Sequence, residues 1–393
     1  NTVPQPTIYL DNNATTQVDP TVFEAMTPWL RDEYGNPSSM YSLGRRAASA
    51  IDQAREQVAS LVGGSPNEIV FTSCGSESIN SAILSAAALD PDKTHIITTA
   101  VEHSATVKLC EHLARRGYEI TWLPVDSSGQ LDLEKLTHAL RPDTALVSLL
   151  WANNETGVLF PIEEISRITN ARKIPLHVDA VQAVGKLPLN VTELGAQVLS
   201  LSRHKLHCPK GVGALHINRR MRFTPWLRGS QEDSRRGGTQ NVASIVGLGQ
   251  AAELAASHLT TEDGAIRNLR DLFESTLLRT VPDSVINGDQ DQRLPNTTNI
   301  AFAGVDSEAV LMLLDEENIC CSAGSACASG SVHPSHVLKA MGFPNDRIRG
   351  SLRFSLGRFN TAAQVDAACE AIPRIVAKLH RLSPADSPVV MAG

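Results

Sequence analysis

The sequence lacks the features that mark membrane, nucleic-acid-binding and secreted proteins. No apolar run in its 393 residues approaches the roughly 18–20 that a membrane-spanning helix needs, so we expect no membrane partner. Basic residues are in deficit, with 35 Lys and Arg against 42 Asp and Glu. Because phosphate binding needs a basic surface, the net charge of −7 argues against a nucleic acid partner. The opening residues, NTVPQPTIYLDNNATT, have neither the basic start nor the apolar stretch of a signal peptide.

The cysteines form no CxxC pair and no even disulfide framework. Their number is seven, an odd count that predicts thiols in a reducing, cytoplasmic setting rather than disulfides. Two histidine-containing clusters, at residues 204–208 and 333–336, lack a fourth ligand at zinc spacing, so we expect no structural metal site. The remaining composition, 42% hydrophobic and 20% charged, is that of an ordinary globular protein with a length typical of two domains.

Residues 68–215 alternate short apolar strands with helical patterns. This alternation predicts an α/β fold, with a mostly parallel sheet covered by helices on both faces. The predicted strands are EIVFTS, THIITTAVEH, DTALVSLLWANNETG, IPLHVDA, QVLSLSRHK and VGALHI.

The pattern changes after residue 258. The segment AIRNLRDLFESTLLRTV places apolar residues on one helical face and is followed by a mixture of short strands and helices. We therefore expect a large domain over residues 16–258, and a smaller α+β domain made of residues 1–15 and 259–393. The segment TTEDG between them is polar and predicts a turn.

Polar side chains follow the predicted strands at the point where each strand ends. Ligands of open parallel sheets bind outside the carboxyl ends of the strands, so this set predicts one polar pocket. Its members are His103, Asn154, Asp179, Gln182, Ser202, His204 and Lys205.

Asp179 and Lys205 allow two interpretations. They could form a simple salt bridge at neighbouring strand ends. Alternatively, a packed sheet and the adjacent His204 depress the pKa of the Lys205 amine, which then reacts with an aldehyde, while Asp179 serves another cation such as a protonated pyridine nitrogen. The spacing alone leaves both open.

Two segments have the composition of phosphate sites. FTSCGSES, residues 71–78, joins a strand to a helix start through Gly75, and Ser76 adds a hydroxyl; the alternative is that Ser76 merely caps the helix. RGSQEDSRRGGTQN, residues 228–241, predicts a loop whose Thr239 could reach a phosphate, or an ordinary surface loop.

Arg353 and Cys327 stand in contrasting surroundings. The alternation of SLRFSLGRF sets Arg353 opposite an apolar face, where it is either a carboxylate-binding fork or a surface strand residue. Cys327 lies in CSAGSACASGS, a run of small residues that neither buries nor immobilises its thiol.

A series of motifs over nearly the whole chain resembles the cysteine desulfurases of the pyridoxal-phosphate-dependent class-V aminotransferase family, most closely the NifS-like branch. This resemblance implies fold type I, with a seven-stranded sheet. The motifs are YLDNNATT, GNPSS, FTSCGSES, VEH, WANNETG, HVDAVQ, SRHKLHCPKG, RRGGTQN, SAGSACASG and RFSLGR.

The resemblance also implies residue roles. Lys205 would hold pyridoxal phosphate and move protons, and Asp179 would pair with the ring nitrogen. His103, also catalytic, would stack on the ring, and Gln182 would contact the ring oxygen. Asn154 would contact cofactor and substrate, sharing the substrate carboxylate with Arg353. The phosphate would be held by Gly75, Ser76, Ser202 and His204, and by Thr239 from the second subunit of a homodimer.

Cys327 would take sulfur from L-cysteine as a persulfide, leaving L-alanine. Small residues on both sides would let the thiol reach the pocket and then an acceptor, expected to be an iron–sulfur scaffold protein, with transient iron–sulfur contact at Cys327 and a use in nitrogen fixation. Two alternatives remain: selenocysteine lyase or another fold-type-I reaction, and a non-enzymatic sulfur or cluster scaffold.

Overall fold

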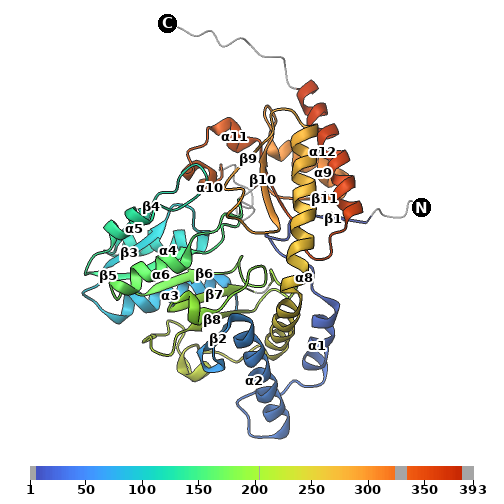
Figure 1. Cartoon of the computed structure of the whole chain (residues 1–393). Coiled ribbons are helices and arrows are strands. Elements are labelled where there is room, and N and C mark those ends of the chain that lie inside the picture. Colours follow the sequence, from blue (N-terminus) through green and yellow to red (C-terminus); the bar gives the residue numbers. More distant parts are fainter. Residues whose placement is uncertain (1–5, 203, 324–333, 383–393) are drawn as a thin grey trace.

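The computed structural model describes residues 6–202, 204–323 and 334–382, except for the side chains of residues 260–263. Its larger part is built on a seven-stranded sheet in the order β2-β8-β7-β6-β5-β3-β4 (Figure 1). Only β8 runs antiparallel to its neighbours in this sheet, so the mostly parallel fold-type-I sheet is confirmed. The strands are β2 (Ile69–Thr72), β3 (His95–Thr99), β4 (Glu119–Leu123), β5 (Thr144–Leu150), β6 (Leu176–Asp179), β7 (Val198–Ser202) and β8 (Gly213–Ile217).

Helices cover both faces of this sheet because its strands are apolar on both sides. Successive strand residues point to opposite faces. Ile96 and Leu146 pack with α3 (Gly75–Leu89) and α4 (Ser104–Ala114), whereas Ile97 and Val147 belong to the core on the other face. The helices that contribute to the core on this other face include α2 (Ser42–Val62), α6 (Ile162–Ala171) and α8 (Val242–Thr280). The shorter or peripheral helices of this part are α1 (Pro20–Arg31), α5 (Leu133–Ala139), α7 (Val191–Leu194), η1 (Pro66–Glu68) and η2 (Glu232–Ser234).

A second core lies around a three-stranded antiparallel sheet, β12-β10-β9. Phe273 and Phe354 meet edge to face at its centre, with ring centroids 4.9 Å apart. Two further strands, β1 and β11, pair in parallel beside it. The elements of this part are β1 (Ile8–Tyr9), β9 (Val285–Ile286), β10 (Thr297–Ala301), α9 (Ser307–Glu316), β11 (Ile319–Cys320), α10 (His336–Ala340), α11 (Asn345–Arg349), β12 (Ser351–Ser355) and α12 (Ala362–Leu382).

The long helix α8 joins the two cores (Figure 1). It contains the segment TTEDG, so the turn predicted there is wrong. Leu248 packs into the core of the large sheet and Leu277 into the second core. Packing at both ends therefore overrides the weak helix propensity of Thr, Asp and Gly between them. The domain boundary at residue 258 stays a prediction. No helix among the described residues is both long and apolar enough to cross a membrane.

Candidate active site

The site lies where four neighbouring parallel strands end. Because β3, β5, β6 and β7 are adjacent and point the same way, the residues that follow them meet at one edge of the sheet. His103, Asn154, Asp179 and Ser202 reach this edge from four strands. Asp179 and Ser202 are buried, and His103 and Asn154 are half-buried. The strand order thus brings these strand ends to one edge of the sheet, and their union in a single polar pocket stays a prediction.

Asp179 is a carboxylate that the protein buries with little compensation. It is 7% exposed, and among the described residues it accepts a hydrogen bond from the backbone N–H of Val181 at 3.0 Å. Burial raises the pKa of Asp179, while the neighbouring bases His103 and Lys205 act to lower it. A cation brought against this carboxylate would therefore be bound favourably.

His103 is held as the neutral imidazole with its proton on Nε2. It is the N-cap of α4, and its Nδ1 accepts the backbone N–H of Ala105 at 3.2 Å. An Nδ1 that accepts a hydrogen bond carries no proton, so the neutral ring carries it on Nε2. The pKa of His103 is lowered by burial and by the charges of Lys205 and His336, against the attraction of Asp179. This ring can therefore exchange a proton through Nε2.

Lys205 follows β7 and is half-buried. Its charge acts to lower the pKa of both His103 and Asp179. It also helps to lower the pKa of His204 to about 4, although burial is the larger cause there. His204 is thus a neutral ring, hydrogen-bonded through Nδ1 to the Thr15 hydroxyl at 3.2 Å.

A second feature of the site is the close approach of α3 to the end of β7. Gly75 is the first residue of α3, and a Cβ added to it would lie 2.8 Å from Cβ of Ser202. Only glycine permits this distance. The N-cap of α3 is Cys74 rather than Ser76, and Ser76 is exposed in the first turn. The free N–H groups of a helix start beside two hydroxyls form a cradle for an anion.

The loop predicted at residues 228–241 lies beside this helix start. Arg236 is anchored there by an ion pair with Glu77 of α3, with 2.8 Å from Nε to Oε1. Thr239, three residues further on, is exposed in the single chain. Its contact with the cofactor of a second subunit stays a prediction.

Arg353 is fully buried, at 2% exposed, so its interpretation as a surface residue is wrong. It lies in β12, which is paired with β10 on one edge and bridged to Asp11 and Ser322 on the other. Its Nη1 donates to the backbone oxygen of Asn154 at 3.0 Å, and its Nη2 to Asp11 at 2.6 Å. Its Nε is buried without a partner among the described residues. The guanidinium thus keeps donor capacity for a further acceptor.

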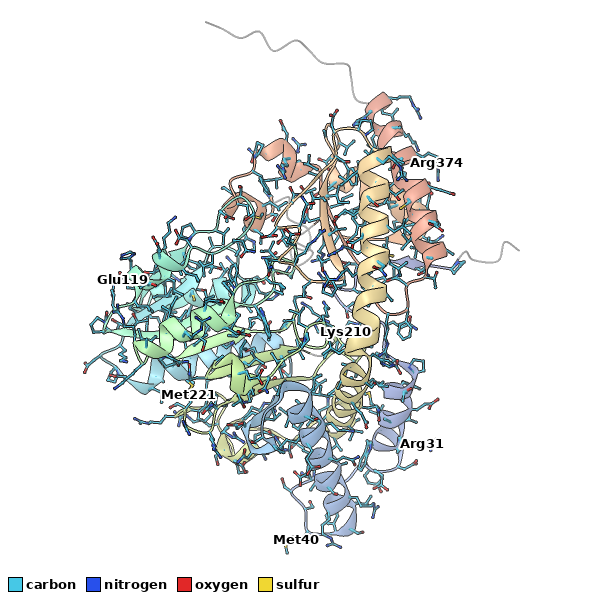
Figure 2. All side chains as sticks on the ribbon, in the orientation of Figure 1. Arg31, Met40, Glu119, Lys210, Met221 and Arg374 are labelled. Carbon is cyan, nitrogen blue, oxygen red and sulfur yellow. The ribbon has the colours of Figure 1, made fainter. Side chains whose placement is uncertain are left out.

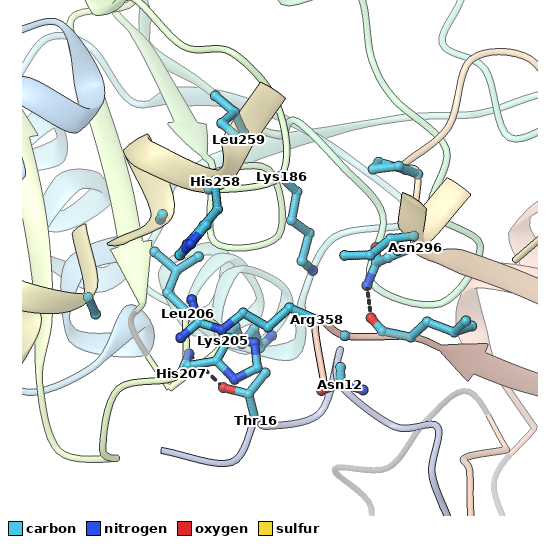
Figure 3. Close-up of a pocket in the computed structure, with 17 residues that line it drawn as sticks. Asn12, Thr16, Lys186, Lys205, Leu206, His207, His258, Leu259, Asn296 and Arg358 are labelled. Carbon is cyan, nitrogen blue, oxygen red and sulfur yellow. Dashed lines mark hydrogen bonds between the residues drawn. The ribbon is translucent and has the colours of Figure 1, made fainter. Parts of the chain in front are cut away.

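Behind the site lie Gln182, which the sequence analysis named, and Lys186, which it missed. Gln182 is 4% exposed, and its Nε2 donates to the backbone oxygen of Asn13 at 3.0 Å. Lys186 donates from Nζ to Oε1 of Gln182 at 2.9 Å and to Oδ1 of Asn13 at 3.0 Å. Figure 3 shows Lys186 extending into a cavity of about 60 Å³ between His258 and Asn296. The signal for Lys186 was its position four residues after Gln182, directly behind a glycine.

Cys327 lies outside the described residues, but both flanks of its segment are placed. Before it, Ser322 pairs with Arg353 through two backbone hydrogen bonds of 2.7 and 3.2 Å. After it, the hydroxyl of Ser335 donates to the buried carboxyl of Glu155, next to Asn154. Both ends of the segment are therefore fixed beside Arg353 and Asn154.

These residues fit pyridoxal phosphate. The under-compensated carboxylate of Asp179 suits a protonated ring nitrogen. The approach of Gly75 to Ser202 suits a phosphate at the start of α3, and Lys205, which follows the same strand as Ser202, supplies the amine.

Comparison with known proteins identifies the family of this chain. Residues 8–368 match the family model described as aminotransferase class-V. A cysteine desulfurase from Nostoc sp. is 54% identical over 378 residues, covering 96% of this chain and 94% of that protein. The cysteine desulfurase NifS of Azotobacter vinelandii is 49% identical over 379 residues, covering 96% and 94%. A NifS-like protein from Rickettsia africae superposes with a TM-score of 0.85 at 35% identity, covering 94% and 99% of the two chains.

Proposed function

The chain belongs to the class-V aminotransferase family, as a pyridoxal-phosphate-dependent cysteine desulfurase of the NifS-like branch, and we propose from this premise that Lys205 carries the cofactor and Cys327 receives the sulfur. The observation that supports this best is the order of the parallel strands, which brings residues at or just after the ends of β3, β6 and β7, namely His103, Asp179 and Lys205, to one edge of the sheet. The same membership favours an enzyme over a non-enzymatic scaffold.

The cofactor would be held by groups from several strands. Asp179 pairs with its ring nitrogen, His103 covers its ring and Gln182 contacts its ring oxygen. When bound, pyridoxal phosphate supplies an electron-withdrawing ring that weakens bonds at the α-carbon of an amino acid. The groups that hold its phosphate are Gly75, Ser76, Ser202, His204 and, from a second subunit, Thr239.

The substrate carboxylate would bind at Arg353 and Asn154. The Nε of Arg353 is a buried donor without a described partner, and a carboxylate supplies the acceptor it lacks. Lys205 and Nε2 of His103 move protons at the reacting end of the substrate.

Cys327 completes the reaction as a nucleophile. Its thiolate attacks the sulfur of L-cysteine, the carbon–sulfur bond breaks, and a proton replaces sulfur on the substrate carbon. The balanced result is L-alanine and a Cys327 persulfide from L-cysteine and the Cys327 thiol. A reference thiol pKa of about 8.5 leaves only a few per cent thiolate at neutral pH, so the site must assist deprotonation. An iron–sulfur scaffold protein is the acceptor we propose, with nitrogenase as one destination.

We also propose a homodimer. Exposed apolar side chains occur along α1 and in the segment that leads to α2, and Met40, at this end of the molecule, is 90% exposed (Figure 2). Exposed apolar surface favours association, and in the homodimer Thr239 of each subunit would serve the other. The exposed residues are Phe23, Leu30, Tyr34, Met40 and Tyr41. The reducing, cytoplasmic setting stays a prediction.

Two variants of the purified holoenzyme test the assignment. Lys205→Ala should lose the visible absorbance of lysine-linked pyridoxal phosphate. Cys327→Ala should keep this absorbance yet release no sulfide from L-cysteine in the presence of a reductant. Cys369→Ala, the matched control in α12, should keep the absorbance and release sulfide at the rate of the parent. An unchanged absorbance in Lys205→Ala, or unchanged sulfide release in Cys327→Ala, would contradict the corresponding role.

A further inference from the structure

We propose that Lys186 is a positioning residue, whose amine fixes the amide of Gln182 so that an N–H of this amide, and not its oxygen, is presented to the ring oxygen of pyridoxal phosphate. The inference rests on the proposed function, in which Gln182 contacts that oxygen. It adds a residue that has no part in the roles described above.

The turn after β6 places the two side chains together. Residues 180–187 form successive tight turns, with Val184 N donating to Ala180 O and Leu187 N to Ala183 O, each at 3.0 Å. In such turns, residues four apart lie on the same side, which brings Lys186 onto Gln182. Gly185 has φ of +76°, and a Cβ there would lie 2.3 Å from Cδ2 of Leu206. Glycine is therefore required directly before Lys186 for its chain to turn inward.

The hydrogen bonds leave one orientation for each amide. The backbone oxygen of Asn13 can only accept, so the amide nitrogen of Gln182 faces it at 3.0 Å. Nζ of Lys186 then donates to the two remaining amide oxygens, Oε1 of Gln182 and Oδ1 of Asn13. Asn296 Nδ2 also donates to Oδ1 of Asn13 at 3.2 Å, which agrees with that assignment. A flipped Gln182 would set N–H against N–H at Lys186 and oxygen against oxygen at Asn13.

This orientation determines what Gln182 offers to a ligand. An amide nitrogen carries two hydrogens, and the backbone oxygen of Asn13 uses one of them. The second remains for an acceptor. The ring oxygen of pyridoxal phosphate is such an acceptor, and it is repelled by an amide oxygen. Lys186 therefore helps to make this contact an attraction rather than a repulsion, without touching the cofactor.

The clamp does not require Lys186 to carry a charge. Burial, together with the charges of Lys205 and Arg353, lowers the pKa of Lys186 well below its usual value, and Lys186 in turn acts on His207. A neutral amine still has two N–H groups, one for each of its acceptors. A long side chain at this position thus acts as a hydrogen-bond donor without adding a third full charge beside Lys205 and Arg353.

A double-mutant cycle on the full-length protein tests this role. Pyridoxal phosphate is titrated into the cofactor-free parent, Lys186→Met, Gln182→Leu and the double variant, with binding followed by visible absorbance. Lys186→Met should weaken binding about tenfold and shift the absorbance band, because the hydrogen bond that orients the Gln182 amide is lost. In the Gln182→Leu background the same substitution should change neither quantity further. Lys108→Met, an exposed lysine of α4, is the control that should match the parent.

Three outcomes would overturn the inference. The first is that Lys186→Met binds pyridoxal phosphate with the affinity and spectrum of the parent. The second is that this substitution weakens binding equally in the parent and in the Gln182→Leu background. The third is that Lys186→Met lowers the melting temperature of the cofactor-free protein but leaves the spectrum of the bound cofactor unchanged. If Lys186→Met does not fold, Lys186→Gln keeps one N–H donor and should lose less than tenfold, and a full loss there would contradict the clamp. Failure of the proposed function is seen separately, because Lys205→Ala would then keep the absorbance band whatever Lys186 does.

Discussion

Replacing Asp179 with asparagine should make the cofactor-free protein more stable and the cofactor-bound protein less stable. The side chain is 7% exposed, and its one described hydrogen bond comes from the backbone N–H of Val181. Asparagine is nearly isosteric and can accept the same hydrogen bond through Oδ1. The substitution therefore removes a buried charge without removing its backbone partner.

The gain follows from the cost of burying that charge. A buried ion without full compensation costs about 1–3 kcal/mol relative to a satisfied neutral group, even after the attraction of His103 and Lys205. The pKa of Asp179 is raised in the folded state, so its ionisation is penalised only above the unfolded value of about 4. Parent and variant should thus be equally stable below about pH 4. The advantage of the variant should grow as pH rises through the folded-state pKa and then level off.

The assay is urea unfolding of the cofactor-free proteins from pH 4 to pH 8, followed by titration with pyridoxal phosphate at pH 8. The cofactor should bind Asp179→Asn at least tenfold more weakly, because a charge-assisted hydrogen bond to the ring nitrogen is lost. Asp19 supplies a matched control: it is also 7% exposed, but it is paired with Arg358. Asp19→Asn leaves that arginine without its counter-charge and should destabilise the protein.

Two results would refute the reasoning. If Asp179→Asn is no more stable than the parent at pH 7 without cofactor, the carboxylate is not under-compensated. If it is more stable but binds pyridoxal phosphate as the parent does, the buried charge is real and serves something other than the cofactor.

Two further substitutions have expected outcomes. Burial raises the pKa of Glu102 to about 8, so Glu102→Gln should keep activity. In urea unfolding, the stability advantage of this variant over the parent should widen between about pH 4 and pH 8, by at most ~1.4 kcal/mol per pH unit. An advantage that does not change with pH would contradict a buried neutral acid. Gly75→Ala places a Cβ 2.8 Å from Cβ of Ser202 and should destabilise the protein by about 1–3 kcal/mol and weaken cofactor binding more than tenfold by absorbance titration, whereas parental binding would show that the cradle can widen.

The sheet and the position of the site could be predicted from local sequence alone. Apolar runs that end in polar residues define both the strands and the edge where they stop, because parallel strands share that edge. The sequence analysis missed β4 because this edge strand is partly exposed, so its residues do not form the continuous apolar run of a buried strand. The turn predicted within α8 failed because packing at both ends of that helix, not local propensity, determines its course.

The pairings inside the site could not be predicted in this way. Arg353 is a strand arginine whose partners, Asp11 and Asn154, lie 342 and 199 residues away along the chain. Lys186 is a lysine in a turn, and its burial depends on Asn13, 173 residues earlier. Local pattern gives the residue types, whereas burial of a charge depends on contacts that form only when distant segments meet.

The charges that these contacts bring together explain why the site favours an anionic ligand. The pKa values of Lys186, His103 and His204 are all lowered, each chiefly by burial and each also by the charge of Lys205. A phosphate or a carboxylate entering this edge reverses that repulsion, since a nearby negative charge favours protonated bases. The fold thus buries several bases whose protonation is unfavourable until an anion binds beside them. The favourable interaction with the anion then helps to hold the phosphate and the substrate carboxylate against the same edge of the sheet.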